Sequence, residues 1–92
     1  MRRDMRLVQE DLNKALTTLG YTPLNKEKTE WRRHQFHLFT KPKKKAKITL
    51  AIHEDVPSPF PPFHRARHKS KQIIQELEKI IDAYQKIRAA KT

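Results

Sequence analysis

The spacing of apolar side chains predicts two helices, one near each end of the chain. Between about residues 4 and 19, apolar residues recur every three or four positions and give one apolar stripe. Gly20 follows the last of them, where the left-handed conformation that ends a helix favours a residue without Cβ. A second stripe, of isoleucines, a leucine and a tyrosine, predicts a helix from about Ser70, a suitable N-cap, to residue 90.

Between the predicted helices the apolar period shortens to two. Residues 31–40 form an aromatic and polar run without proline or glycine, which favours a strand. Residues 47–53 alternate between large apolar side chains and polar or small ones, which predicts a second strand. The lysine-rich segment 41–45 between them predicts a hairpin with a basic tip. Residues 21–28 supply either an early part of the first strand or a separate short one.

Residues 56–63 can form neither a helix nor an inner strand, because four of them are prolines. Proline fixes φ and removes a backbone donor, so we expect an extended, stiff connector that crosses the sheet. Phe60 and Phe63 are expected to anchor this connector in the core. A ligand for a proline-binding module is the alternative.

These elements predict one α+β domain over residues 1–92. A small antiparallel sheet of two or three strands carries both helices on one face, because this arrangement buries both apolar stripes. The opposite face of the sheet is then open to water. The stripe of the C-terminal helix is wider than one small sheet needs, so a homodimer or a protein partner through that helix is an alternative to complete burial.

Composition excludes several classes of protein. The chain has no cysteine, which removes disulfides, cysteine-ligated zinc and thiol catalysis, and its single glycine removes a glycine-rich phosphate loop. No apolar run is long enough to span a membrane, and the first residues do not resemble a secretory signal. We therefore expect a cytoplasmic protein without a membrane partner.

Positive charge is concentrated in two blocks. The chain has 21 Lys and Arg against 10 Asp and Glu, a net charge of +11. Residues 26–47 contain nine basic and two acidic residues, a net of +7, and residues 63–71 add +4. Such blocks attract polyphosphate, because each neutralised phosphate releases condensed counterions. We expect a nucleic-acid partner, with an acidic protein as the weaker alternative. The interpretation without a binding role is that the charge only keeps the protein soluble or belongs to an unstructured basic tail.

Strand alternation assigns side chains to the two faces of the sheet. If Phe36 and Leu38 lie in the core, His34 also points inward, whereas Trp31, Arg33, Gln35, His37 and Phe39 point outward beside Thr49, Ala51 and His53. A shift of one residue would expose His34 and bury His37 instead. Outward aromatics can stack unpaired bases, which favours structured RNA over DNA. The residues expected to bind nucleic acid are Arg32, Arg33, His37, Lys41, Lys43, Lys44, Lys45, Lys47, His53, Arg65, Arg67, Lys69 and Lys71.

Histidine also makes a catalytic hypothesis available. An imidazole can take or give a proton near neutral pH, and RNA supplies its own 2′-hydroxyl nucleophile, so cleavage needs no metal. His37 is the candidate general acid or base, with Arg33 or Lys47 to stabilise phosphate charge and His53 as the second histidine. We expect no metal and no cofactor, because alternation along a strand separates His34 from His37. Histidines that only assist phosphate contact are the alternative.

The layout resembles the HicA family, over about residues 8–53. The segments that carry the resemblance are Leu12-x3-Leu16-x2-Leu19-Gly20-Tyr21, Arg33-His34-Gln35-Phe36-His37-Leu38-Phe39-x2-Pro42 and Ile48-Thr49-Leu50-x2-His53, with a closing helix. The resemblance implies a fold like that of double-stranded-RNA-binding domains, a metal-independent ribonuclease toxin and a HicB-like antitoxin as partner. Aligned on His34-Gln35-Phe36, Arg33 stands where the family has its catalytic first histidine. Aligned on His37-Leu38-Phe39, only the second histidine of the family is matched.

Overall fold

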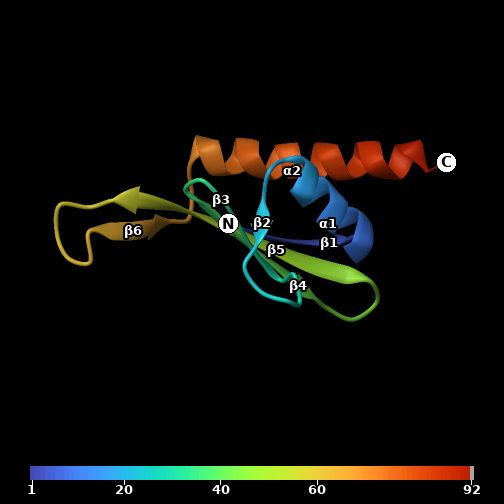
Figure 1. The fold of residues 1–92 in the computed structure, drawn as a ribbon, viewed down its shortest axis with the longest axis horizontal. Coiled ribbons are helices and arrows are strands. Elements are labelled where there is room, and N and C mark those ends of the chain that lie inside the picture. The colour runs from blue at the N-terminus through green and yellow to red at the C-terminus, as the bar shows by residue number, and fades with distance from the viewer. Residues whose placement is uncertain (92) are drawn as a thin grey trace.

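The computed structural model describes residues 1–91 and has two helices and an antiparallel sheet (Figure 1). Six strands lie within the described residues, in the order β1-β5-β4-β3-β2, with β6 paired to the far part of β5. The α+β class is confirmed, with more strands than the two or three predicted. The elements are β1 (Arg2–Arg6), α1 (Gln9–Thr18), β2 (Thr22–Pro23), β3 (Glu30–Arg33), β4 (Phe36–Pro42), β5 (Lys47–Pro57), β6 (His64–Arg67) and α2 (Lys71–Ala90).

The long strand β5 organises the sheet. One side of β5 pairs with β4, and its other side pairs first with β1 and then with β6. Its inward residues Ile48, Leu50 and Ile52 are almost fully buried beneath the helices. Both helices lie on the same side of the sheet, as predicted, so the other side has no covering layer (Figure 1).

The first helix is shorter than predicted, because the chain begins with a strand. The structure places Arg2–Arg6 in β1, paired with residues 47–51 of β5, and α1 starts at Gln9. The sequence Arg-Arg-Asp-Met-Arg alternates as well as it fits a helix, and the free backbone groups of β5 offer it a ladder of hydrogen bonds. Gly20 has φ +95° just after the helix, as its position predicted.

Residues 31–40 form two strands rather than one. β3 and β4 are joined by a turn at His34 and Gln35, and His34 has φ +55°. The reversal pairs Trp31 with Leu38, so both side chains point inward and Trp31 is only 1% exposed. The predictions that Trp31 points outward and His34 inward are therefore wrong. Two-residue turns reverse the alternation that a single strand would have.

The hairpin of β4 and β5 is confirmed, with Lys43, Lys44 and Lys45 in its turn. Lys45 and Ala46 both have positive φ, which closes the turn without glycine. Lys41 and Pro42 belong to the end of β4. We call residues 41–47 the basic tip.

The proline-rich segment does not cross the sheet. β5 continues to Pro57, the chain turns over residues 58–63, and β6 returns along β5 (Figure 1). Phe60 is 73% exposed and Phe63 64% exposed, so the prediction that they anchor in the core is wrong. The prolines lie at the end of a strand and in the turn, where their missing donors leave no gap in the ladder. We call residues 54–67 the β5–β6 arm.

The C-terminal helix is confirmed almost to the residue. The Ser70 hydroxyl accepts a hydrogen bond from the Ile73 amide (3.1 Å), so Ser70 is the predicted N-cap. The apolar stripe packs into the core with the sheet and α1. Among residues 1–91, no helix has both the length and the apolar character that crossing a membrane requires.

Candidate nucleic-acid interface

The side of the sheet away from the helices carries the candidate site, and we call it the open face. The strand registers place alternate side chains of β1, β3, β4 and β5 on this face. His37 and Phe39 lie there beside His53 and Ala51, as predicted. The charged residues on it are Arg2, Asp4, Arg6, Glu30, Arg32, Lys41, Lys47 and Asp55.

A groove of about 400 Å³ lies on the open face, and we call it the Phe39 groove. Phe39 and Ala51 are directly opposite each other on β4 and β5 and form its apolar part. The cationic side chains of Arg2, Lys41 and Lys43 line it, together with Thr29 and Thr49. The groove thus combines an aromatic ring with three positive charges.

Arg2 reaches this groove only because β1 exists. It pairs with Ala51 of β5, whereas the helix predicted over residues 4–19 gave Arg2 no place in the sheet. Met5 is the one apolar residue of this segment, and it fits both an inward strand position and the spacing of the helix that follows, so no local pattern identifies β1.

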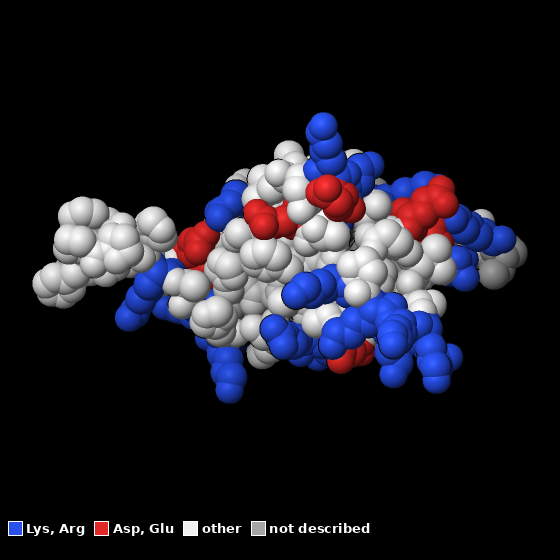
Figure 2. Space-filling view, turned by 90° about the horizontal axis from the view of Figure 1, so that it is seen from below, with Lys and Arg blue, Asp and Glu red and all other residues white. Residues whose placement is uncertain are grey.

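The basic tip extends the positive surface beyond the groove. Figure 2 shows lysine and arginine atoms gathered at this end of the face, with few acidic atoms among them. A hollow of about 480 Å³ there is lined by Lys43, Lys44, Lys45, Lys47 and Asp4. Within residues 1–91, Lys41, Lys44, Lys45 and Lys47 form no ion pair, and Lys43 lies 4.0 Å from Asp4. Most of this positive charge is therefore available to an outside partner.

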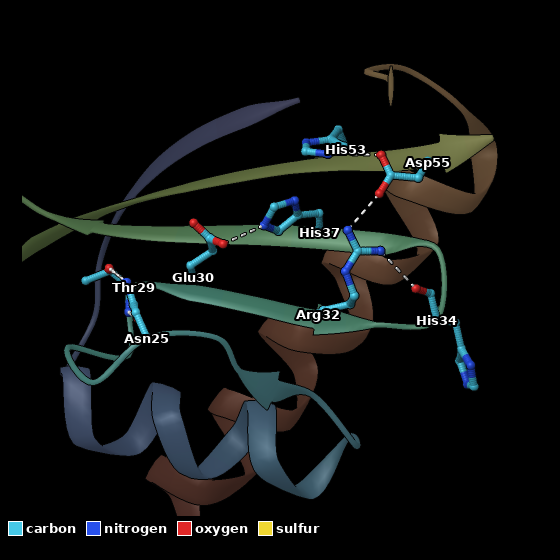
Figure 3. Close-up of polar contacts among 8 residues, drawn as sticks. All are labelled: Asn25, Thr29, Glu30, Arg32, His34, His37, His53 and Asp55. Atoms are coloured by element: carbon cyan, nitrogen blue, oxygen red, sulfur yellow. Dashed lines mark hydrogen bonds and ion pairs between the residues drawn. The ribbon is translucent and has the colours of Figure 1, made fainter. Parts of the chain in front are cut away.

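A polar cluster lies on the open face next to the groove (Figure 3). His37 and His53 are cross-strand partners with ring centroids 4.9 Å apart. Asp55 lies 3.3 Å from His53 Nε2 and accepts a hydrogen bond of 2.8 Å from Arg32. We call these four residues the histidine cluster. Glu30 lies 3.3 Å from His37 Nε2, which is buried and has no aligned hydrogen bond within the described residues.

Burial and hydrogen bonding shift the pKa values of two groups in this cluster, His53 and Asp55. Burial lowers the pKa of His53, helped by the nearby positive groups and opposed by Asp55, which favours the neutral imidazole. The hydrogen bond from Arg32 holds the pKa of Asp55 below its usual range. A neutral imidazole beside a second histidine can accept a proton or contact a phosphate.

The same cluster is where a metal ion would fit best in residues 1–91. His37, His53 and Asp55 each offer a ligand atom, and these atoms lie within 4.8 Å of one another. Spacing within one segment does not reveal this group, because pairing of β4 with β5 brings its members together. Arg32 already supplies a cation to Asp55, and we assign no metal to the cluster.

Two groups of expected binding residues lie away from the groove. Arg33 points to the helix side, where it lies 3.0 Å from the buried Glu76, so its predicted place on the open face is wrong. Tyr21 donates a second hydrogen bond (2.7 Å) to the same carboxylate. Arg65 and Arg67 are exposed on β6 opposite Val56 and Glu54, on the helix side of the strand pair rather than on the open face. The exposed Lys69 lies between β6 and α2, and the exposed Lys71 is the first residue of α2.

Comparison with models of protein families, with curated proteins and with solved structures found no match for this chain.

Proposed function

We propose that this protein binds structured RNA through the Phe39 groove and the basic tip. The observation that carries the proposal is the groove itself, where an aromatic ring lies among three cationic side chains. Phe39 would stack a base, and Arg2, Lys41 and Lys43 would bind the phosphates on either side of it.

RNA is favoured over duplex DNA because the groove offers an aromatic ring on which an unpaired base can stack. A base must leave its stack to lie on Phe39, and loops and bulges of folded RNA supply such bases. The order of α1, the hairpin strands β3–β5 and α2, with both helices on one face, supports a likeness to double-stranded-RNA-binding domains. This likeness and the resemblance of residues 8–53 to the HicA family both favour RNA as the ligand.

A salt titration tests the binding proposal. Arg2, Lys41, Lys43, Lys44, Lys45 and Lys47 offer six phosphate contacts, so log affinity for an RNA stem-loop should fall against log salt concentration with a slope of about −5. Fluorescence anisotropy over a series of KCl concentrations measures this slope. Absence of RNA binding at low salt would refute the proposal and favour an acidic protein partner, such as a HicB-like antitoxin, on the same face.

The histidine cluster favours a second candidate function, a metal-independent ribonuclease. The rings of His37 and His53 lie 4.9 Å apart, close enough to act on one phosphodiester. His53 would accept the 2′-hydroxyl proton as that oxygen bonds to phosphorus, and His37 would give a proton to the 5′-oxygen that leaves, so the products are a 2′,3′-cyclic phosphate and a 5′-hydroxyl. Arg32 is placed beside them and would stabilise charge on the phosphate.

Replacing His37 by alanine should reduce RNA cleavage about 100- to 10,000-fold and leave RNA binding nearly unchanged. The assay uses labelled RNA with EDTA present, at pH values from about 5 to 8. His34→Ala is the matched control, since His34 is exposed in the β3–β4 turn outside the cluster. If the unmodified protein binds RNA but does not cleave it at any of these pH values, the ribonuclease hypothesis is wrong and RNA binding is the only function that remains.

A further inference from the structure

The tip of the β5–β6 arm exposes two aromatic side chains that the proposed groove does not use. Phe60 and Phe63 are 73% and 64% exposed, and no charged residue lies between positions 56 and 63. Figure 2 shows this tip as an uncharged protrusion at the end of the molecule opposite the basic tip. Apolar surface concentrated on a projecting element commonly marks a contact site.

The tip has a defined shape. The Ser58 amide donates to the Phe63 carbonyl (2.9 Å), and the Phe63 amide donates to the Phe60 carbonyl (2.6 Å). Prolines at positions 57, 59, 61 and 62 restrict the backbone further. Both rings are thus presented at little cost in conformational entropy when something binds them.

The strand that returns from the tip is positively charged. All four residues of β6 are exposed, and from position 56 to position 71 the chain has four basic residues and no acidic one. Arg67 lies 3.8 Å from Glu54, whereas Arg65 forms no ion pair within the described chain. The phenylalanine rings can stack on the base of a nucleotide, and the guanidinium of Arg65 can bind its phosphate.

We propose that the arm tip stacks unpaired bases of the RNA while Arg65 binds an adjoining phosphate. This inference rests on the proposed RNA-binding function and names the feature of the RNA that the protein selects, a loop or bulge. Phe63 lies in the turn and Arg65 in β6, two residues further along, so their Cα atoms are at most about 7 Å apart. One nucleotide can therefore contact both, because stacking requires only a free base face and is tolerant of sequence.

The positions of the arm and the groove define how the RNA would lie. Ala51 in the groove and Pro57 at the start of the tip are six residues apart on β5, about 20 Å along the strand. A short stem can bind the basic tip through its phosphates while one unpaired base lies on Phe39 and others reach Phe60 and Phe63. The positive charge of Arg65 beside the two rings favours a polyanion over an uncharged protein groove as the occupant.

The test compares a stem-loop RNA, with 2-aminopurine in its loop, and a blunt duplex of the same stem sequence. The unmodified protein should bind the stem-loop roughly ten- to a hundredfold more tightly and change the 2-aminopurine fluorescence. The double variant Phe60→Ala/Phe63→Ala should lose about tenfold of this preference and most of the fluorescence change, while Phe39 retains the remainder, and it should keep its affinity for the duplex. Leu24→Ala/Ile74→Ala is the matched control, because these apolar residues are exposed elsewhere.

The outcomes separate failure of this inference from failure of the proposed function. Equal affinity of the unmodified protein for both RNAs, or an unchanged preference in the arm variant, would overturn the role of the arm while leaving RNA binding intact. No binding to either RNA would overturn both. Binding of the arm to anionic phospholipid vesicles without any preference for the stem-loop would replace the inference by a membrane contact.

Discussion

Replacing Trp31 by alanine is expected to lower the free energy of unfolding by about 3–5 kcal/mol. Trp31 is 1% exposed and is the largest side chain in the core. Its indole Nε1 also donates a hydrogen bond of 3.0 Å to the Lys28 carbonyl, which accepts a second one from the Thr40 hydroxyl (3.1 Å), so the substitution leaves a cavity and removes one of these two hydrogen bonds. Since the total free energy of unfolding of a domain is about 5–15 kcal/mol, the substitution removes a large part of it. Urea denaturation should therefore show a much lower midpoint or no folded protein at all.

Trp31→Phe separates the two contributions. Phenylalanine fills most of the space but cannot donate to Lys28, so we expect a smaller loss of about 1–3 kcal/mol. Trp31 is the only tryptophan, and its fluorescence should be that of a buried indole and should not change when RNA binds. Emission typical of exposed tryptophan, or an alanine variant as stable as the unmodified protein, would contradict the observed register.

Trp31 also shows where prediction from the sequence ends. Residues 31–40 contain no glycine or proline, so nothing local marks the turn at His34 and Gln35. Treating the run as one strand put Trp31 on the open face, but the turn reverses the alternation and buries it. His37 and Phe39 were assigned correctly because their alternation with Phe36 and Leu38 lies within a single strand, β4.

Elements with strong local signals were predictable. The helix α2 has both a long apolar stripe and a serine cap, and the β4–β5 hairpin has alternating strands around a lysine-rich turn. The basic tip, which provides most of the candidate site's charge, was therefore identified from the sequence. Gly20 likewise marked the end of α1 by its conformation alone.

The rest of the site depends on pairing between distant segments. Arg2 lies in the groove because β1 pairs with residues 47–51, a contact across about half the chain that no local pattern encodes. The arm was missed for a related reason, since its prolines suggested an isolated connector while its ends pair as strands. Pairing of β1 with β5 brings Arg2 to the same groove as Phe39, and this completes the groove beside the basic hairpin.

The triple variant Arg2→Ala/Lys41→Ala/Lys43→Ala should weaken RNA binding on the order of a hundredfold at 0.1 M salt. Each lost phosphate contact should also make the salt dependence shallower by about one unit, so the slope should change from about −5 to about −2 or −3. All three side chains are exposed, so the melting temperature should stay close to that of the unmodified protein. Anisotropy titrations at several salt concentrations give both the affinity and the slope.

A second triple variant, Lys14→Ala/Lys79→Ala/Lys86→Ala, distinguishes local from overall charge. It removes the same number of positive charges, but from exposed positions on the helices, where these lysines form ion pairs with Glu10, Glu76 and Asp82. If the open face binds the RNA, the slope and affinity of this variant should stay near those of the unmodified protein. Equal losses in the two variants would mean that net charge alone attracts the RNA. The groove would then have no special role, because screened long-range attraction does not depend on which face carries the charge.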